Sequence, residues 1–116
     1  ANGQKFAFRG YLPADSAGRV GYLKTIEQDS QRRNESQIFI ETPYRNNALL
    51  ADAVAALQAD TLLCAASNLT LPEQRIISMT ASEWRKQPQL PDLHKQPTVF
   101  VVYAAGQTPV PARKRR

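Results

Sequence analysis

The chain has 116 residues, of which 42% are hydrophobic and 22% charged, a composition typical of one small globular domain. It contains no apolar run of the roughly 20 residues needed to span a bilayer, which excludes the class of helical membrane proteins. It also starts without an initiating Met or a hydrophobic signal region. We therefore expect a piece of a longer protein, and the single cysteine, Cys64, within an apolar run favours a reducing, cytoplasmic compartment.

The net charge of +5 is concentrated at the C-terminal end. The last four residues, 113–116, are all Lys or Arg, so the rest of the chain is nearly neutral. Such an end can contact phosphates or can act as a solubilising tail. We predict a disordered basic tail over residues 107–116. The single cysteine, Cys64, excludes an internal disulfide, and one Cys with one His excludes a structural zinc site.

The first predicted elements are a strand and a helix. Lys5–Gly10 alternates, with Phe6 and Phe8 on one side and charged or small residues on the other, which predicts a strand with one wetter face. Asp15 or Ser16 can cap a helix that runs to about Arg33. Its inward positions would be Val20, Leu23 and Ile26.

A strand-helix-strand unit follows. The strand Ile38–Ile40 ends at Glu41, and Thr42 with Pro43 predicts a helix start, since Thr is a good N-cap and Pro suits the first helical position. The continuous apolar run Leu62–Ala66 predicts a strand covered on both sides. We expect the ends of these two strands to lie side by side, where open α/β sheets bind small molecules. The helix between them has one apolar stripe, formed by Leu50, Ala53, Val54 and Leu57.

The remaining pattern completes one domain. Arg75–Met79 predicts a strand, Ala81–Lys86 a short helix, and 87–96 a Pro-rich loop. Pro97–Ala104 is a second continuous apolar run and is expected to be a central strand. The predicted fold class is therefore α/β, a single layered domain over residues 1–106. Its mixed sheet has about five strands flanked by helices, in the order β-α-β-α-β-β-α-β.

Four segments together carry a resemblance to a known superfamily. The sequence FIETPYRNNALLADAVAAL at 39–57 resembles the segment after the domain boundary in the tetrapyrrole methylase superfamily, the S-adenosylmethionine-dependent methyltransferases that modify corrins and porphyrins. Glu41–Arg45 and Ala66–Thr70 are similar to two motifs of the branch that methylates a ribose hydroxyl of small-subunit ribosomal RNA. In that branch, Tyr44 would be His and Ser67-Asn68 would be Arg-Glu. Pro72–Arg75 looks like a motif found in the porphyrin and corrin enzymes. Pro97–Val102 looks like the closing strand of the whole superfamily.

The resemblance implies the C-terminal domain of a two-domain methyltransferase, with S-adenosylmethionine bound between the domains. The N-terminal domain and its Gly-rich loop are not encoded in this chain, so that domain is the expected partner, together with a second copy in a homodimer. The implied methyl acceptor is RNA or a tetrapyrrole. Tyr44 and Arg45 are the implied substrate-binding residues. The implied cofactor-binding residues are Ile40, Glu41, Ala65, Ala66, Ser67 and Thr98.

These residues also have structural interpretations that leave the function open. Glu41 and Arg45 are four residues apart at a helix start, where an acid is favourable without any ligand. Ala65 and Ala66 are small residues that a crowded sheet would need in any case. The second class of function is a non-catalytic domain that binds a nucleotide-like ligand or holds a dimer. For the isolated chain we expect folding, weak cofactor binding at most, and no methyl transfer.

Overall fold

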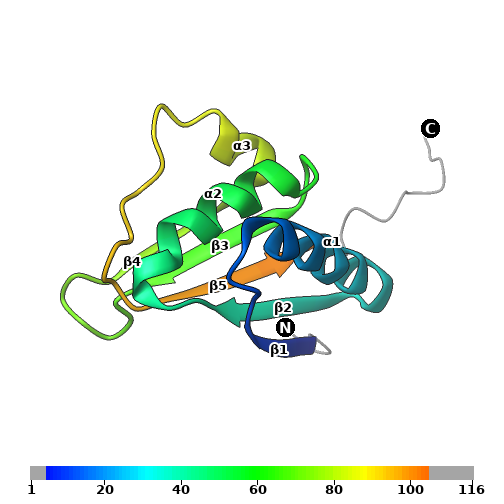
Figure 1. Cartoon of the computed structure of the whole chain (residues 1–116), viewed down its shortest axis with the longest axis horizontal. Helices are drawn as coiled ribbons and strands as arrows, with labels where there is room; N and C mark the ends of the chain where they lie inside the picture. Colours follow the sequence, from blue (N-terminus) through cyan, green and yellow to red (C-terminus); the bar gives the residue numbers. More distant parts are fainter. Residues whose placement is uncertain (1–4, 105–116) are drawn as a thin grey trace.

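The elements follow the predicted order along the chain. The computed structural model describes residues 5–104, and Figure 1 shows their arrangement. The described strands are β1 (Lys5–Tyr11), β2 (Glu35–Ile40), β3 (Leu62–Ser67), β4 (Arg75–Thr80) and β5 (Thr98–Tyr103). The helices are α1 (Ser16–Arg33), α2 (Asn46–Ala56) and α3 (Ala81–Arg85), and a 3₁₀ turn, η1 (Pro43–Arg45), precedes α2. The predicted tail at 107–116 lies outside the described residues.

Capping residues determine where the helices begin and end. Asp15 caps α1 by accepting a 2.8 Å hydrogen bond from the backbone N–H of Gly18. Asn34 ends that helix in the left-handed region at φ 52°. Thr80 and Glu83 form a reciprocal capping box at α3. The predicted helix start after Thr42 is present, but its first turn is 3₁₀ and the Thr42 side chain makes no capping bond.

The five strands form one mixed sheet in the order β1-β2-β5-β3-β4. β1 and β2 are parallel, whereas β5 is antiparallel to both of its neighbours, β2 and β3. The central position predicted for the last strand is therefore confirmed. The prediction that the ends of β2 and β3 are adjacent is wrong, because the start of β5 lies between them. Strand order depends on pairing between distant segments, which local patterns do not encode.

All three helices lie on one side of the sheet, which we call the covered face (Figure 1). Its central row places Phe39 beside Phe100 and Phe100 beside Ala65, and the two phenyl rings stack with centroids 5.7 Å apart. Leu23 and Ile26 of α1 and the apolar stripe of α2 pack over this face and complete the core. Trp84 of α3 is also buried there, and its indole N–H donates to the Leu63 carbonyl at 2.9 Å.

The opposite side, which we call the open face, is covered by no helix within residues 5–104. The two-sided cover predicted for β3 and β5 is therefore missing from the described part of the chain. Alternate residues of β5 show this directly, since Phe100 and Val102 are buried whereas Val99 and Val101 are half-buried. By strand register, the open face consists of Phe6, Phe8, Tyr11, Ser36, Ile38, Ile40, Leu62, Cys64, Ala66, Ile76, Ser78, Thr80, Val99, Val101 and Tyr103.

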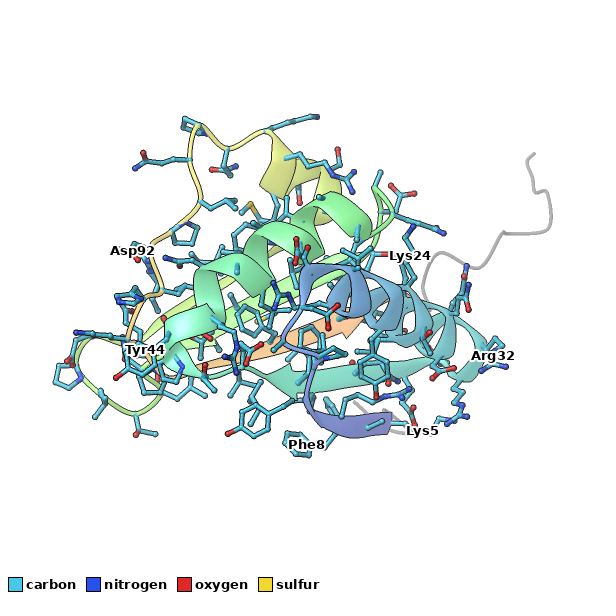
Figure 2. All side chains as sticks on the ribbon, in the orientation of Figure 1. Lys5, Phe8, Lys24, Arg32, Tyr44 and Asp92 are labelled. Carbon is cyan, nitrogen blue, oxygen red and sulfur yellow. The ribbon has the colours of Figure 1, made fainter. Side chains whose placement is uncertain are left out.

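A bulge in β1 determines which side chains of the edge strand reach the open face. The register with β2 shifts between Phe8 and Gly10, and Gly10 has φ +71°, a conformation that side chains disfavour. The extra residue returns Tyr11 to the face that carries Phe8. Phe8 is 67% exposed, and Figure 2 shows it at the margin of the molecule. The wetter face of β1 is thus the aromatic one.

The charged side of β1 is held against the helices instead. Arg9 donates to the Gln37 amide oxygen at 2.6 Å and also pairs with Asp29 of α1. Asp29 accepts a second charged hydrogen bond, from Arg32, at 2.5 Å. The two guanidinium groups, that of Arg9 first, hold the pKa of Asp29 below its ordinary value.

None of the helices in the described part of the chain is long and apolar enough to cross a membrane.

Candidate functional site

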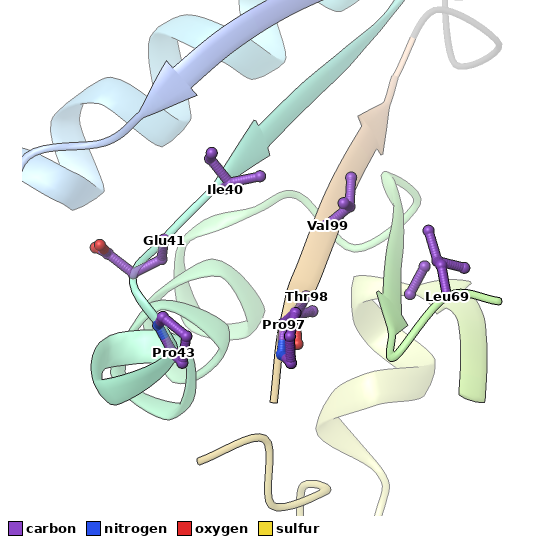
Figure 3. A pocket seen from close by; sticks show the side chains of 8 residues that line it. Ile40, Glu41, Pro43, Leu69, Pro97, Thr98 and Val99 are labelled. Atoms are coloured by element: carbon purple, nitrogen blue, oxygen red, sulfur yellow. The ribbon is translucent and has the colours of Figure 1, made fainter. Parts of the chain in front are cut away.

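An apolar pocket of about 330 Å³ opens where β2 and β3 end and β5 begins (Figure 3). Its volume lies at the lower end of the range for small-molecule sites. Thr98 and Glu41 are the two polar residues at this pocket. The six apolar residues that line it are Ile40, Pro43, Ala66, Leu69, Pro97 and Val99.

Backbone hydrogen bonds tie together the three chain segments around the pocket. The N–H of Asn68, just after β3, donates to the Pro97 carbonyl at 2.9 Å. The N–H of Lys95 donates to the Pro43 carbonyl at 3.1 Å. The end of β3, the start of η1 and the approach to β5 are therefore held in fixed positions relative to one another. A pocket held in this way exists before any ligand binds.

Asn46 fixes this arrangement, although its role was not predicted from the sequence. It is fully buried at the first position of α2. Its amide nitrogen donates to the Gln96 carbonyl at 2.6 Å, to the Leu93 carbonyl at 3.2 Å and to the Thr98 hydroxyl at 3.3 Å. Two adjacent Asn residues at a helix start were the available signal, because Asn side chains bond readily to nearby backbone.

Four of the six predicted cofactor residues lie at the pocket: Ile40, Glu41, Ala66 and Thr98. Ala65 and Ser67 do not, because strand alternation turns both to the covered face. The Thr98 side chain also points inward, where its hydroxyl donates to the Gln96 carbonyl at 2.9 Å. Any contact that Thr98 makes with a ligand would therefore come from its backbone. A role for these residues in binding a cofactor stays a prediction.

The Glu41 carboxylate points away from the pocket (Figure 3). It accepts a hydrogen bond from the N–H of Thr42 at 2.7 Å and lies 3.4 Å from Nε of Arg45. Its other oxygen is 3.9 Å from the buried guanidinium of Arg19, which also pairs with Asp52 of α2 at 2.9 Å. This side chain therefore joins β2, η1 and α1. Its contacts with Thr42 and Arg45 fit the structural role weighed for it from the sequence, whereas its contact with Arg19 was not predicted.

The two predicted substrate residues do not line the pocket, but they directly follow Pro43, which does. Tyr44 is 70% exposed and packs edge-on against His94, with ring centroids 5.8 Å apart. Arg45 is about half exposed and is already paired with Glu41. Tyr44 is thus the more available of the two for contact with another molecule.

A second, polar hollow of about 470 Å³ lies on the loops beside the apolar pocket. It is lined by Asn68, Glu73, Arg75, Lys95 and Gln96. The Asn68 amide donates to the Gln96 amide oxygen at 2.9 Å, which joins the two loops that form it. Its lining includes two cationic side chains and one acidic side chain, so its formal net charge is positive.

The lining of the pocket is suited to binding an apolar ligand. Among residues 5–104, no three His, Cys, Asp or Glu side chains lie close enough together to hold a metal ion. Burial raises the pKa of the Cys64 thiol, which disfavours the reactive thiolate. What the arrangement offers is an apolar hollow with strand-end backbone groups at its margin.

No family model and no curated protein matches the chain. Solved structures do match. The methyltransferase CobJ covers 87% of this chain at 19% identity, with a TM-score of 0.51, and the match covers 41% of CobJ. A uroporphyrin-III-C-methyltransferase from Thermus thermophilus covers 89% of the chain at 13% identity, with a TM-score of 0.46, and the match covers 40% of that protein.

Another structure of the Thermus thermophilus enzyme, complexed with S-adenyl homocysteine, covers 92% of the chain at 9% identity, with a TM-score of 0.48. The match covers 46% of that protein. The chain thus spans less than half the length of each of these structures. At these identities the likeness concerns architecture: the chain has the mixed α/β fold found in part of the methyltransferase CobJ.

Proposed function

We propose that the apolar pocket binds the adenosine half of S-adenosylmethionine, in the C-terminal domain of a two-domain methyltransferase of the tetrapyrrole methylase superfamily. One observation carries the proposal. The residues that resemble the superfamily at Ile40–Pro43, Ala66 and Pro97–Val99 come together around one pocket, on a fold that is also found in a methyltransferase.

The pocket suits an adenine ring on physical grounds. Ile40, Leu69 and Val99 offer apolar walls, and the small side chain of Ala66 leaves room for a flat ring against the sheet. The transfer of a methyl group from a sulfonium is an in-line displacement, in which positioning contributes most of the rate. A domain that only holds the adenosine can therefore contribute to catalysis without supplying a reactive side chain.

The proposal requires a second wall from another domain. Small-molecule sites bury about 70–90% of their ligand, and this pocket is open on one side. A domain preceding this one in the intact protein would close it, in line with the greater length of CobJ. For this chain alone, we expect binding weaker than about 1 μM and no methyl transfer.

For the methyl acceptor, we propose an anionic tetrapyrrole rather than RNA. The polar hollow places two cations, Arg75 and Lys95, next to the cofactor pocket, which suits a few carboxylates. An RNA chain presents many phosphates and is usually met by a longer basic surface. The ribosomal RNA branch also carries Arg-Glu where this chain has Ser67-Asn68. Methylation of RNA instead of a tetrapyrrole by the intact protein would refute this part.

Two leucines in one loop provide a matched test of the pocket. Leu69 lines it and is 43% exposed, whereas Leu71 is 48% exposed and does not line it. In titrations with S-adenosylhomocysteine followed by NMR, Leu69→Arg should abolish the weak binding of the chain, and Leu71→Arg should preserve it. Thr98→Arg is a poorer choice, because it would remove the bond to Asn46.

The outcomes that would contradict the proposal are distinct. Equal loss or equal retention of binding in both Leu variants would move the site elsewhere. Submicromolar binding by the chain alone, or turnover in a radiolabelled methyl assay, would show that the site is complete and that no second domain is needed.

A further inference from the structure

The two edge strands of the sheet are built differently. At β1, the bulge at Gly10, the charge of Lys5 and the inward-turned Arg9 all discourage a further strand from pairing. β4, at the opposite edge, contains neither a bulge nor a proline, and its only charged residue is its first, Arg75. An edge strand of this kind is a template for pairing with another chain.

The backbone groups that β4 presents at this edge follow from its pairing with β3. The N–H of Ala81, directly after β4, donates to the Thr61 carbonyl at 2.8 Å. Because hydrogen-bonded residues alternate along an antiparallel pair, every second residue counted back from Ala81 bonds to β3. The residues between them, Ile76 and Ser78, therefore point their N–H and C=O groups outward. Within residues 5–104, no strand pairs with this side of β4.

A hollow of about 250 Å³, which we call the edge pocket, lies beside β4 on the covered face. Its apolar lining includes Ile77 and Met79 of β4, Trp84 of α3 and Leu90 of the following loop. Arg75 also lines it and makes no ion pair within residues 5–104. Along one face of β4, the edge pocket thus offers two apolar contacts and one unpaired cation.

We propose that β4 and the edge pocket bind an extended, acidic segment of another protein, which pairs antiparallel to β4 as a sixth strand. In this mode of recognition, main-chain hydrogen bonds give affinity and pockets for alternate side chains give specificity. The bound residues opposite Ile77 and Met79 are apolar, and the residue opposite Arg75 is a carboxylate. These are the non-hydrogen-bonded positions of the pair, where facing side chains lie closest.

Charge and packing distinguish this partner from two others. The basic residues 113–116 of the chain itself would bring like charges to Arg75. A second copy paired through β4 would offer its Ile77 and Met79, but both are already packed against the core of their own copy. An acidic segment with free apolar side chains meets neither obstacle.

The inference goes beyond the proposed function and does not rest on it. No residue that lines the apolar pocket also lines the edge pocket. Arg75 alone is shared with the polar hollow. Binding of a peptide and binding of a cofactor are therefore measured separately, and either can fail without the other.

A capped peptide, Thr-Leu-Thr-Leu-Thr-Asp-Thr, serves as the probe, with its leucines opposite Met79 and Ile77 and its aspartate opposite Arg75. Trp84 is the only tryptophan of the chain, so its fluorescence reports whether the edge pocket is occupied. We expect saturable binding with a dissociation constant on the order of 100 μM. The same peptide with N-methyl groups on its third and fifth residues keeps every side chain but loses bonds to β4. It should bind at least about 10-fold more weakly.

Ser78→Pro is the matched change in the protein. Because the N–H of Ser78 points outward, proline removes a bond to the peptide and none to β3, and such an edge position tolerates it. This variant should weaken binding about 10-fold or more. Ser78→Ala keeps the N–H and should bind the peptide as the wild-type chain does.

A charge exchange tests the acidic character of the partner. Arg75→Glu should weaken binding of the probe and strengthen binding of the peptide that has lysine in place of aspartate. Arg75 is exposed, so the fold should persist. If Arg75→Glu changes the affinity for both peptides alike, the partner is not selected by its charge.

The proposal would be overturned by equal affinities of the plain and N-methylated peptides, or by no binding at about 1 mM peptide. Competition by a synthetic peptide of residues 107–116 would make the basic end the occupant instead. A wild-type dimer in sedimentation equilibrium that Ser78→Pro converts to monomers would make a second copy the occupant. If Ser78→Pro fails to fold, as judged by circular dichroism, the N-methylated peptide decides alone.

Discussion

The two faces of the sheet are made from the same strands and are almost equally apolar, yet only one is buried by the described chain. The covered face has a core of Phe39, Phe100 and Val102 beneath α1 and α2. The open face has Ile38, Val99 and Val101 in the same strands, and these remain half-buried. A continuous apolar strand indicates that both faces of the sheet avoid water. The comparison teaches that a single domain can bury only one of these faces with its own helices.

The largest expected effect uses one phenylalanine from each face. Phe100→Ala should lower the free energy of unfolding by about 4 kcal/mol, because Phe100 is fully buried and its loss leaves a cavity. Phe8→Ala should cost less than about 1 kcal/mol in the monomer, since Phe8 is mostly exposed. Urea unfolding at low protein concentration measures both. Similar losses in the two variants would show that the faces are equally covered.

The next effect concerns a buried charged side chain, Arg19, on the covered side of the sheet. Arg19 is 4% exposed and faces the carboxylates of Glu41 and Asp52. Arg19→Met should lower the unfolding free energy by about 2–3 kcal/mol, because the buried Glu41 carboxylate then keeps only the half-exposed Arg45 as its cation and the partly exposed Asp52 loses its ion pair. Arg33→Met, at an exposed position at the end of the same helix, should change it by less than about 0.5 kcal/mol. A neutral result for Arg19→Met would mean that water reaches these carboxylates.

Two adjacent valines of β5 give a finer comparison. Val102 is fully buried on the covered face, and Val101 lies on the open face. Val102→Thr should cost about 1–2 kcal/mol, because it buries a hydroxyl, whereas Val101→Thr should cost about 0.5 kcal/mol or less. Chemical unfolding of the monomer measures the difference. A cost for Val101→Thr that grows with protein concentration would instead support a second copy on the open face.

The smallest effect is a pH dependence on the covered side of β1. Because Arg9 and Arg32 lower the pKa of Asp29, the ionised carboxylate stabilises the fold above the ordinary Asp pKa near 3.8. This stabilisation is lost as the pH falls below that value, through the pKa of the folded state. Asp29→Asn should therefore destabilise the chain by about 1 kcal/mol or less at pH 6. The difference from wild type should shrink below about pH 4.

The control for Asp29 is Asp60→Asn, at an exposed turn position. It should leave the pH dependence of unfolding unchanged. If the Asp29→Asn and wild-type curves stay parallel down to pH 3, the ion pair with Arg9 does not contribute in solution.

The sequence predicted the succession of elements well, because each depends on local information. The periodicity of α1, its cap at Asp15 and the apolar run of β5 are all short-range signals. The position of β5 between β2 and β3 was not predictable in this way, since it follows from pairing across the whole chain. Nor did any local signal place Arg19 beside Glu41, 22 positions further along the sequence.

For the candidate site, the sequence named four residues that the structure places at one pocket, but it did not predict which way the side chains of Glu41 and Thr98 point. Strand alternation places Ala66 on one face of the sheet and Ala65 and Ser67 on the other. The sequence does not tell which of these faces the helices cover. The part played by Asn46 depends on three groups that lie about fifty residues later in the chain. Such bonds are visible only once the strands are assembled.

The central position of the last strand has a consequence for how the chain folds. Without residues 98–103, the sheet is two separate pairs, β1 with β2 and β3 with β4, and isolated two-stranded units are at best marginally stable in water. During synthesis, neither pair has its central neighbour until almost the whole domain has emerged from the ribosome. Because the joining contacts are distant in sequence, folding should be slow and nearly all-or-none. Nascent chains cut short before Thr98 should therefore be targets for chaperones and proteases.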